Sequence, residues 1–387
     1  MKYRIVVLGG HGHFGARITR GLLGNLNIQV IVTGRDIIKA KKVFDSEIKN
    51  MAGLEFSTLD ITADNFREKI LSLNARLLIH TAGPFQAQDY FVARTCIEEG
   101  IDYIDLADGR DFVCNFSGQL DALAKKHQRI AITGASTLPA LSSAVVDAFI
   151  GRFDSLDEIQ TVIAPAQRTP LGPATLQSVL SYCGRPFKWW QKGQWKSVVG
   201  WQTLQRVSFA HLDSRLASPC DVPDHALFVE RYPGVQTVQF RAALELSVLQ
   251  RALSLFSFIR SAGIALPLAS ASRLLIRLAR LMDRFGSDAG GMFVILRGQK
   301  NDHYYELRWD LTAPALHGPE IPCMAAILLA RKLANSNRMS AGSYACMGLL
   351  TLEDFFPEFL RWGITHEVSE STQNFIEVVG AAQKQSL

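Results

Sequence analysis

Close to its first residue, the chain passes from an apolar run straight into a glycine-rich turn. Residues 5–8 are apolar, and an amphipathic helical pattern begins directly after the turn. The turn has the spacing G-x-G-x-x-G, carried by Gly10-His11-Gly12-His13-Phe14-Gly15. The hexapeptide alone is weak evidence, but between a strand and a helix it is typical of the phosphate-binding turn of a dinucleotide fold. A glycine-rich turn without a ligand is the alternative.

Each glycine of this turn has a separate task in such folds. Gly10 permits the tight turn, Gly12 lets the backbone approach a pyrophosphate, and Gly15 allows the helix to pack closely on the strand. The N–H groups and the dipole at the start of the helix then face the phosphate charge. The sequence therefore predicts cofactor contacts at Gly10, Gly12, His13, Phe14 and Gly15.

Short apolar runs alternate with helical patterns across residues 1–150. Strands that are apolar on both faces imply a parallel sheet that is covered by helices on both sides. The expected strands are 5–8, 28–33, 54–59, 77–81, 103–106 and 130–133. We therefore predict an α/β protein in which residues 1–150 form a Rossmann domain built on a doubly wound parallel sheet.

The end of the second expected strand indicates which dinucleotide is bound. Enzymes that use NAD usually place an Asp or Glu here to accept hydrogen bonds from the ribose 2′-OH. This chain instead has Thr33-Gly34-Arg35, and the Arg35 guanidinium suits a 2′-phosphate. The sequence thus predicts NADP(H), with NAD(H) less favoured. In the alternative, Arg35 is a solvated surface residue and Asp36, which we expect to cap a helix, binds the ribose.

Two further segments follow the ends of expected strands. Asp60 follows the third strand, where it can bond the adenine edge or cap the next turn, and both interpretations stay open. The segment Thr81-Ala82-Gly83-Pro84-Phe85 follows the fourth strand, where the crevice of a Rossmann sheet opens. We expect this segment to line the nicotinamide side of the cofactor, although Gly and Pro also end strands without any ligand.

Beyond about residue 150 the pattern changes to longer elements of antiparallel type. Residues 292–297 and 304–311 are predicted to pair as a hairpin. Tryptophans gather around an expected turn at Lys192-Gly193, and such a cluster is more often core or interface than ligand pocket. We predict a second, α+β domain over residues 151–387 that carries an antiparallel sheet.

Charge and cysteine content exclude some classes of protein. The formal net charge of +5 over 387 residues is too small to indicate a nucleic-acid partner. The six cysteines are scattered without metal-ligand spacing, which is typical of reduced, cytosolic thiols and predicts no metal site. The first residues lack the pattern of a secretory signal, so we expect a cytoplasmic protein.

With these residues placed, residues 1 to about 150 resemble the saccharopine-dehydrogenase-like NADP-binding family. The resemblance rests on Gly9 to Gly15, on Ala82-Gly83-Pro84-Phe85, on the spacing from Cys96 to Asp105, and on the loop from Gly134 to Leu141. The second half resembles, less specifically, the substrate and dimerisation domain of such proteins. The resemblance implies an NADP-dependent oxidoreductase and leaves the substrate open, because a shared fold does not transfer a reaction.

Hydride transfer needs a proton donor or charge stabiliser near the reacting heteroatom. We select His317 as the general acid, oriented by Glu320, because histidine titrates near neutrality without help. Asp221 lies in a stiff polar segment, and Arg110 can pair with a substrate carboxylate. Each of the three has a purely structural alternative, such as a helix cap, a surface histidine or a loop salt bridge.

A basic, apolar stretch near residues 245–285 interrupts the second half. Four arginines recur there at helical spacing: Arg273, Arg277, Arg280 and Arg284. Such a helix can lie on anionic lipid, or it can pack internally with a solvated arginine face. Two functions therefore stay open: an oxidoreductase acting on a small carbonyl, imine or secondary amine, and a non-catalytic dinucleotide-binding or membrane-associated scaffold. A homodimer is also left open.

Overall fold

The computed structural model of the chain describes residues 2–50, 54–86, 88–170, 173–264, 280–335 and 339–373. The chain divides into two compact units. The first contains Met1–Leu141 together with Pro319–Leu350, and the second contains Ser142–Gly318 together with Thr351–Leu387. The sequence predicted one boundary near residue 150, whereas here the first unit also takes in a segment from far along the chain.

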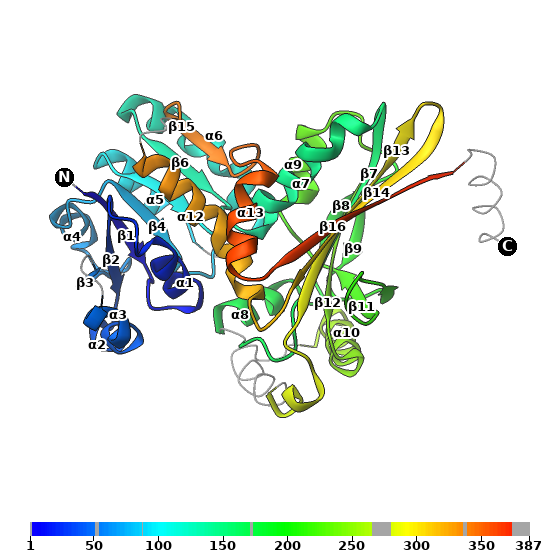
Figure 1. Ribbon diagram of the computed structural model, residues 1–387, viewed down its shortest axis with the longest axis horizontal. Helices are drawn as coiled ribbons and strands as arrows, with labels where there is room; N and C mark the ends of the chain where they lie inside the picture. The colour runs from blue at the N-terminus through cyan, green and yellow to red at the C-terminus, as the bar shows by residue number, and fades with distance from the viewer. Residues whose placement is uncertain are drawn as a thin grey trace. The chain divides into compact units, whose positions relative to one another are not determined.

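The first unit is built on a seven-stranded parallel sheet of Rossmann type, as predicted (Figure 1). Its order is β15-β6-β5-β4-β1-β2-β3. The strands are β1 (Tyr3–Leu8), β2 (Ile28–Gly34), β3 (Leu54–Thr58), β4 (Leu77–His80), β5 (Asp102–Asp105), β6 (Ile130–Thr133) and β15 (Gly342–Ala345). The six expected strands are confirmed. The seventh, β15, pairs in parallel with β6 at the edge of the sheet.

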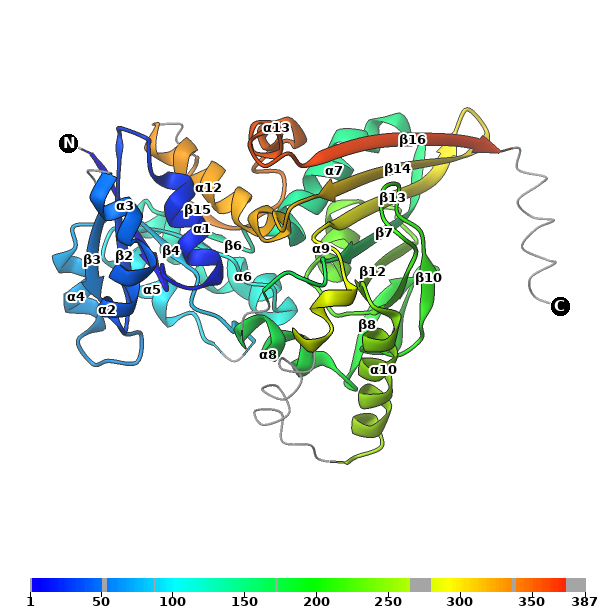
Figure 2. The ribbon, with the colours of Figure 1, turned by 60° about the horizontal axis from the view of Figure 1, so that its bottom comes forward.

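Helices connect these strands: α1 (His13–Leu22), α2 (Ile37–Val43), α3 (Asp45–Asn50), α4 (Phe66–Ser72), α5 (Phe91–Glu98), α6 (Arg110–His127) and, later in the chain, α12 (Ile321–Ala334). The α12 helix packs against α1, so two helices distant in sequence lie side by side (Figure 1 and Figure 2). At this contact Gly21 faces Ile327, whose Cδ1 would lie 2.4 Å from a Cβ on Gly21. The central strands β1 and β4 have fully buried apolar side chains, which accounts for their apolar sequence on both faces.

The second unit carries a nine-stranded sheet that is antiparallel except between β7 and β12. Its order is β10-β11-β12-β7-β13-β14-β16, and the β8–β9 hairpin pairs with β12. The strands are β7 (Ser155–Ala164), β8 (Pro186–Gln191), β9 (Gln194–Val199), β10 (Gln205–Val207), β11 (Arg215–Pro219), β12 (Thr237–Leu244), β13 (Gly290–Lys300), β14 (His303–Ala313) and β16 (Thr365–Gln373).

The predicted hairpin and the predicted turn of this unit are both confirmed. β13 and β14 pair along their whole length, and Asn301 and Asp302 between them have φ of 50° and 65°. β8 and β9 meet at Lys192 and Gly193, with φ of 52° and 69°. Two consecutive residues with positive φ suit the right-handed twist of a two-residue hairpin, which explains the polar and glycine residues at both turns.

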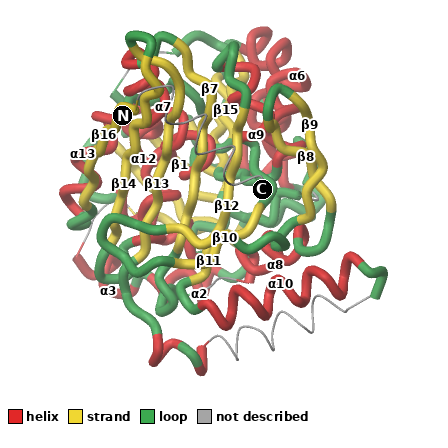
Figure 3. The backbone as a smooth tube through the Cα atoms, turned by 90° about the vertical axis from the view of Figure 1, so that its right-hand side faces the viewer, coloured by secondary structure: helices red, strands yellow, loops and turns green. Residues whose placement is uncertain are grey.

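The helices of the second unit are α7 (Ser142–Phe149), α8 (Pro173–Tyr182), α9 (Asp224–Arg231), α10 (Ser247–Ser261) and α13 (Leu352–Arg361). The view in Figure 3 shows that α10 runs along the margin of the unit rather than across the strands. At the start of α13, the Thr351 side chain accepts from the Asp354 N–H, and the Asp354 carboxylate accepts from the Thr351 N–H. Among the described residues, no helix is both long and apolar enough to cross a membrane.

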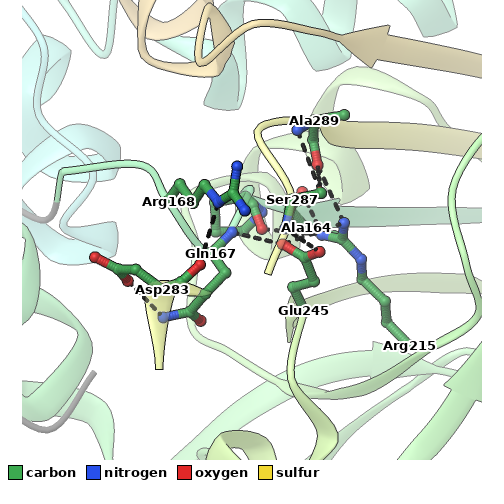
Figure 4. Close-up of polar contacts among 9 residues, drawn as sticks. Ala164, Gln167, Arg168, Arg215, Glu245, Asp283, Ser287 and Ala289 are labelled. Atoms are coloured by element: carbon green, nitrogen blue, oxygen red, sulfur yellow. Dashed lines mark hydrogen bonds and ion pairs between the residues drawn. The ribbon is translucent and has the colours of Figure 1, made fainter. Parts of the chain in front are cut away.

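A buried ion pair joins the ends of three strands of the second unit (Figure 4). The Arg215 guanidinium donates to the carbonyls of Ala164 and Ala289 at 3.1 Å each, and it lies 4.0 Å from the Glu245 carboxylate. The same carboxylate accepts from the backbone N–H groups of Gln167 at 2.6 Å and Ser287 at 2.7 Å. The ends of β7 and β12 and the start of β13 are therefore held by one arginine and one glutamate.

Candidate functional site

The turn between β1 and α1 leaves no room for side chains at its glycines. Gly9 has φ of +75°, a conformation that side chains rarely adopt. A Cβ on Gly10 would lie 2.8 Å from the Val7 carbonyl oxygen. A Cβ on Gly15 would lie 2.3 Å from the Gly9 carbonyl oxygen and 2.7 Å from Thr81 Oγ1. The turn therefore packs backbone against backbone, and Gly15 is the position with the least space.

The first turn of α1 presents its backbone N–H groups without a competing side chain. Gly12 is the N-cap residue, and in this described stretch neither a side-chain cap nor an acidic residue occupies the first turn. The first N–H groups of a helix have no partner within the helix, and the helix dipole adds partial positive charge there. A helix start at a glycine turn with these properties is suited to a phosphate group.

The end of β2 carries Arg35 and Asp36, both exposed. The Asp36 carboxylate accepts from the Lys39 N–H at 2.9 Å and thereby caps α2, as the sequence predicted. The Asp36 carboxylate, which could otherwise bind a ribose, is thus used as a helix cap. Arg35 is the other charged side chain directly after β2. The arrangement favours a ligand with negative charge at this point.

His11 and Asp60 flank the same strand end. A Cβ on Gly34 would lie 2.5 Å from His11 Cε1, so the imidazole ring packs directly on the end of β2. Burial, together with the charge of Lys39, lowers the pKa of His11. Asp60 accepts from the Thr62 N–H at 3.0 Å and from Thr62 Oγ1 at 2.8 Å. These hydrogen bonds and the charge of Arg35 lower the pKa of Asp60 and keep its carboxylate charged beside the arginine.

The segment after β4 is held firmly in place. Thr81 Oγ1 donates to the Leu8 carbonyl at 2.8 Å, and the Gln88 amide donates to the carbonyls of Ala82 and Pro84 at 2.8 and 3.0 Å. The Gly83–Pro84 peptide bond is cis. Phe85 is buried, with its ring edge-on to His80 at a centroid distance of 5.0 Å. This fixed loop follows the carboxyl end of a central parallel strand, where ligands of such sheets bind.

Below this loop, three titratable residues are buried at the ends of β4 and β5. His80 Nδ1 lies 3.0 Å from the Tyr103 hydroxyl, and both side chains are about 1% exposed. Asp105 Oδ1 accepts from the N–H groups of Ala107 and Gly134 and from Thr133 Oγ1 at 2.8 to 2.9 Å. Burial raises the pKa of Asp105 to about 6 despite these hydrogen bonds. The cluster ties β4, β5 and β6 together beneath the loop.

The raised pKa of Asp105 predicts a specific dependence of stability on pH. Between its ordinary pKa of 3.8 and about 6, the folded protein keeps a proton that the unfolded chain has released. The free energy of unfolding therefore falls by roughly 3 kcal/mol as the pH rises from about 4 to about 6. We expect the Asp105→Asn variant to lack this loss, so that its stability relative to wild type is higher at pH 7 than at pH 4. Urea unfolding across this range measures the difference, and the exposed Asp64→Asn is the control. A pH-independent difference for Asp105→Asn would contradict the assignment.

The three candidate catalytic residues lie in different surroundings. Arg110 is the first residue of α6 in the first unit and is half-buried. In the second unit, Asp221 Oδ1 lies 3.6 Å from His225 Nδ1. Also in that unit, His317 Nδ1 donates to the Trp362 carbonyl at 2.7 Å. Glu320, expected to orient His317, forms an ion pair with Arg17 at 2.9 Å in the first unit.

Next to Asp221, the structure reveals polar residues that sequence reasoning did not select. The Asp224 side chain is buried, and its Oδ2 accepts from Ser142 Oγ at 2.6 Å. Burial raises the pKa of Asp224 to about 7. His225 is fully buried, and its Nε2 accepts from the Phe240 N–H at 3.1 Å. The proline-stiffened segment from 220 to 225 was the available signal, because polar residues in an apolar region mark it.

Arg241 on β12 was also not selected from the sequence. Its side chain is 7% exposed, and its guanidinium carbon lies 5.1 Å from the centre of the Trp189 ring. The guanidinium donates to the Thr203 carbonyl at 3.4 Å. Burial lowers the pKa of Arg241 to about 10. Within the described part of the chain, no group of three or more His, Cys, Asp or Glu residues is arranged to hold a metal ion.

The first part of the chain matches a known protein family. Residues 5–145, less than half of the chain, match the family described as the saccharopine dehydrogenase NADP binding domain. No curated protein matches the chain.

Among solved structures, apo saccharopine dehydrogenase (L-Glu forming) from Saccharomyces cerevisiae is similar, with a TM-score of 0.68 and 13% identity over 95% of this chain and 100% of that one. At this identity the likeness concerns the fold alone.

Two further structures share less of the fold. An engineered D-amino acid dehydrogenase bound to NADP+ has a TM-score of 0.49 and 11% identity, over 92% of this chain and 99% of that one. The DAP dehydrogenase of C. glutamicum in complex with DAP has a TM-score of 0.47 and 11% identity, over 92% of this chain and 99% of that one.

Proposed function

Since residues 5–145 belong to the saccharopine dehydrogenase NADP-binding domain family, we propose that the protein is an NADP(H)-dependent oxidoreductase. The family match and the shared fold support an oxidoreductase that uses NAD(P). The proposed reaction is hydride transfer to or from a small carbonyl, imine or secondary-amine compound. The six cysteines are thiols and not disulfides, which suits the cytoplasmic location included in this proposal.

The fit of the glycine turn to a pyrophosphate carries the proposal. A Cβ at Gly15 would overlap the Gly9 carbonyl, so the turn has room only for glycine here and leaves a bare backbone surface at the start of α1. That helix start is uncapped by any described side chain and has no acid in its first turn. Gly10, Gly12, His13, Phe14 and Gly15 would hold the pyrophosphate, and Arg35 would hold the 2′-phosphate.

The residues facing the nicotinamide are proposed from their positions at strand ends. Thr81, Ala82, Gly83, Pro84 and Phe85 would line that side, because they follow a central strand and are fixed by hydrogen bonds. The cofactor, when bound, supplies the hydride. What the chain must add is a proton and a charge partner for the substrate heteroatom.

His317 stays our proposed general acid, with Asp221 and Arg110 as further candidates. Because His317 Nδ1 donates to the Trp362 carbonyl, Nε2 is the ring nitrogen that can exchange a proton. Asp221 would act beside His225, and Arg110 would pair with an acidic group of the substrate.

Cofactor choice tests the proposal through Arg35. We expect wild-type protein to quench or shift NADPH fluorescence on binding and to prefer NADPH to NADH. The Arg35→Ala variant should lose about 1.5 to 3 kcal/mol of NADPH affinity, which is tenfold or more, because a charge-assisted hydrogen bond to the phosphate is removed. Its NADH affinity should not change. Fluorescence titration and thermal shift with each dinucleotide measure both values.

The matched control is Lys41→Ala, which removes an exposed cation from the far end of α2. This variant should keep the wild-type preference. Equal NADPH and NADH binding by wild-type protein would remove the NADP(H) preference, whereas no response to either dinucleotide would overturn the cofactor site itself.

A further inference from the structure

The side chains that α10 buries are polar. Its buried residues are Gln250, Ser254 and Ser257. The Gln250 amide accepts from the Leu244 N–H at 2.9 Å and donates to Ser218 Oγ at 2.8 Å, while Ser257 Oγ donates to the Gly200 carbonyl at 2.6 Å. A helix on the surface of a globular protein normally buries its apolar stripe. Here hydrogen bonds fasten the helix to its unit through the opposite, polar face.

The outer face of α10 exposes large apolar side chains to solvent. Val248 is 55% exposed, Leu255 is 61% exposed and Phe258 is 54% exposed. The short stretch that resumes at residue 280 adds Leu281 and Phe285, which are 69% and 59% exposed. We call these five residues the α10 patch. A group of exposed apolar side chains marks an interaction surface more often than single exposed ones do.

The two parts of the α10 patch belong to one local structure. The Ser287 N–H donates to the Glu245 carboxylate at 2.7 Å. Ser287 closely follows Phe285, and Glu245 closely precedes Ser247, the first residue of α10, so this bond connects the second stretch to the start of the helix. Gln167 links the two as well, since its backbone N–H donates to Glu245 and its side chain donates to Asp283 at 3.1 Å. Figure 3 shows α10 at the margin of the unit, where its outer face is not covered by the sheet.

Cations accompany the α10 patch. Arg251 lies on the outer side of α10, and Arg280 and Arg284 lie in the second stretch, all three exposed. The Arg284 guanidinium stacks over Phe285 with its carbon 4.6 Å from the ring centre. Asp283 is the only acid in the described parts of residues 247–285, and its side chain accepts a hydrogen bond from Gln167. The surface is therefore apolar and positively charged.

This charge argues against a second copy of the chain as the occupant. A two-fold dimer would bring the same patch of both copies together. Arg251, Arg280 and Arg284 of both copies would then lie in one interface, and like charges in an interface are costly. An anionic surface that also accepts apolar side chains satisfies both properties at once.

We propose that the α10 patch docks on an anionic lipid surface, with Leu255 and Phe258 entering the acyl boundary and Arg251, Arg280 and Arg284 contacting phosphate headgroups. Such peripheral contact combines buried apolar area with attraction of basic side chains to anionic lipids. With 15 residues, α10 is shorter than a bilayer span, and its inner face is hydrogen-bonded to the protein. The helix therefore lies on the membrane and does not cross it. Arg273 and Arg277, also expected in this contact, lie outside the described residues and are not needed for it.

Vesicle flotation of the full chain tests the proposal. We expect the wild-type protein to float with vesicles of phosphatidylglycerol mixed with phosphatidylcholine and not with pure phosphatidylcholine. High salt should release it, because surface charges are screened. The double variant Leu255→Glu, Phe258→Glu should bind more than about tenfold more weakly. Arg251→Gln should bind about fivefold more weakly.

Matched controls place the same charge on exposed leucines elsewhere. Leu26→Glu in the first unit and Leu360→Glu in α13 replace side chains that are 85% and 84% exposed, and both should float like wild type. Urea unfolding of every variant shows that it is folded. Absence of binding to anionic vesicles, or equal loss in the control variants, would overturn the proposal. So would concentration-dependent dimers that only the double variant abolishes, because the α10 patch would then be a self-association surface.

Discussion

Replacing Gly15 with alanine should reduce NADPH affinity about a hundredfold. The added methyl group would lie 2.3 Å from the Gly9 carbonyl oxygen and 2.8 Å from the Gly10 Cα, and both are backbone atoms. The turn must therefore move, and overpacking of this kind costs up to about 3 kcal/mol. The displaced N–H groups would no longer converge on the pyrophosphate. Fluorescence titration with NADPH and urea unfolding measure the two effects.

Gly118→Ala is the matched control for this substitution. Gly118 lies within α6, and a Cβ there would meet nothing within 4 Å. Alanine is favoured over glycine inside a helix, so this variant should be more stable by about 0.5 to 1 kcal/mol with unchanged NADPH binding. A loss of stability in Gly15→Ala together with a gain in Gly118→Ala would isolate the steric role of Gly15. Wild-type affinity in Gly15→Ala would show that the turn does not hold the cofactor.

Replacing Glu245 with alanine should lower the free energy of unfolding by about 3 to 5 kcal/mol. The Arg215 side chain beside it is 2% exposed, so the variant leaves a buried guanidinium without its counter-charge. The N–H groups of Gln167 and Ser287 lose their acceptor as well. Although burial raises the pKa of Glu245, the hydrogen bonds from Gln167 and Ser287 and the charge of Arg215 lower it overall. This stability is therefore present above the ordinary pKa of 4.5 and is lost as the pH falls through the lower, folded value.

Glu47→Ala serves as the comparison for Glu245→Ala. Glu47 pairs with Arg20, whose side chain is 44% exposed, and pairs of this kind contribute at most about 1 kcal/mol. Urea unfolding of both variants at neutral pH gives the contrast. Similar losses from the two substitutions would mean that the pair in Figure 4 is no more important than a surface pair.

Local sequence predicted the strands of the first unit because their environment is uniform. The apolar side chains of β1 and β4 are buried on both faces, so residues 5–8 and 77–79 form continuous apolar runs that are visible without knowledge of the fold. The glycine turn was equally visible, since Gly15 has a packing reason that no other residue type can satisfy. The capping role of Asp36 followed from the same local chemistry.

The seventh strand of this sheet could not be predicted in the same way. β15 has only four residues, Gly342-Ser343-Tyr344-Ala345, and its side chains are not uniformly apolar. Its strand conformation comes from pairing with β6, more than two hundred residues earlier. Long-range pairing of this kind leaves no periodic signal in the segment itself.

The polar residues of the second unit were only partly predictable. The segment from 220 to 225 stood out because of its prolines and acids, yet sequence alone could not tell that Asp224 would be buried against Ser142 while Asp221 would lie beside His225. The basic character of residues 245–285 was also visible. The reversed orientation of α10 was not, because burial of Gln250 depends on partners in β11 and β12.

The return of residues 319–350 to the first unit affects how the protein is made. During synthesis, β6 remains the open edge of the nascent sheet until β15 has emerged, after nearly the whole second unit has been translated. Unpaired strand edges are sites of misassociation, so the nascent chain carries this liability for most of its elongation. A shortened form of the first unit should therefore join residue 141 to residue 319 by a linker and not stop at residue 150.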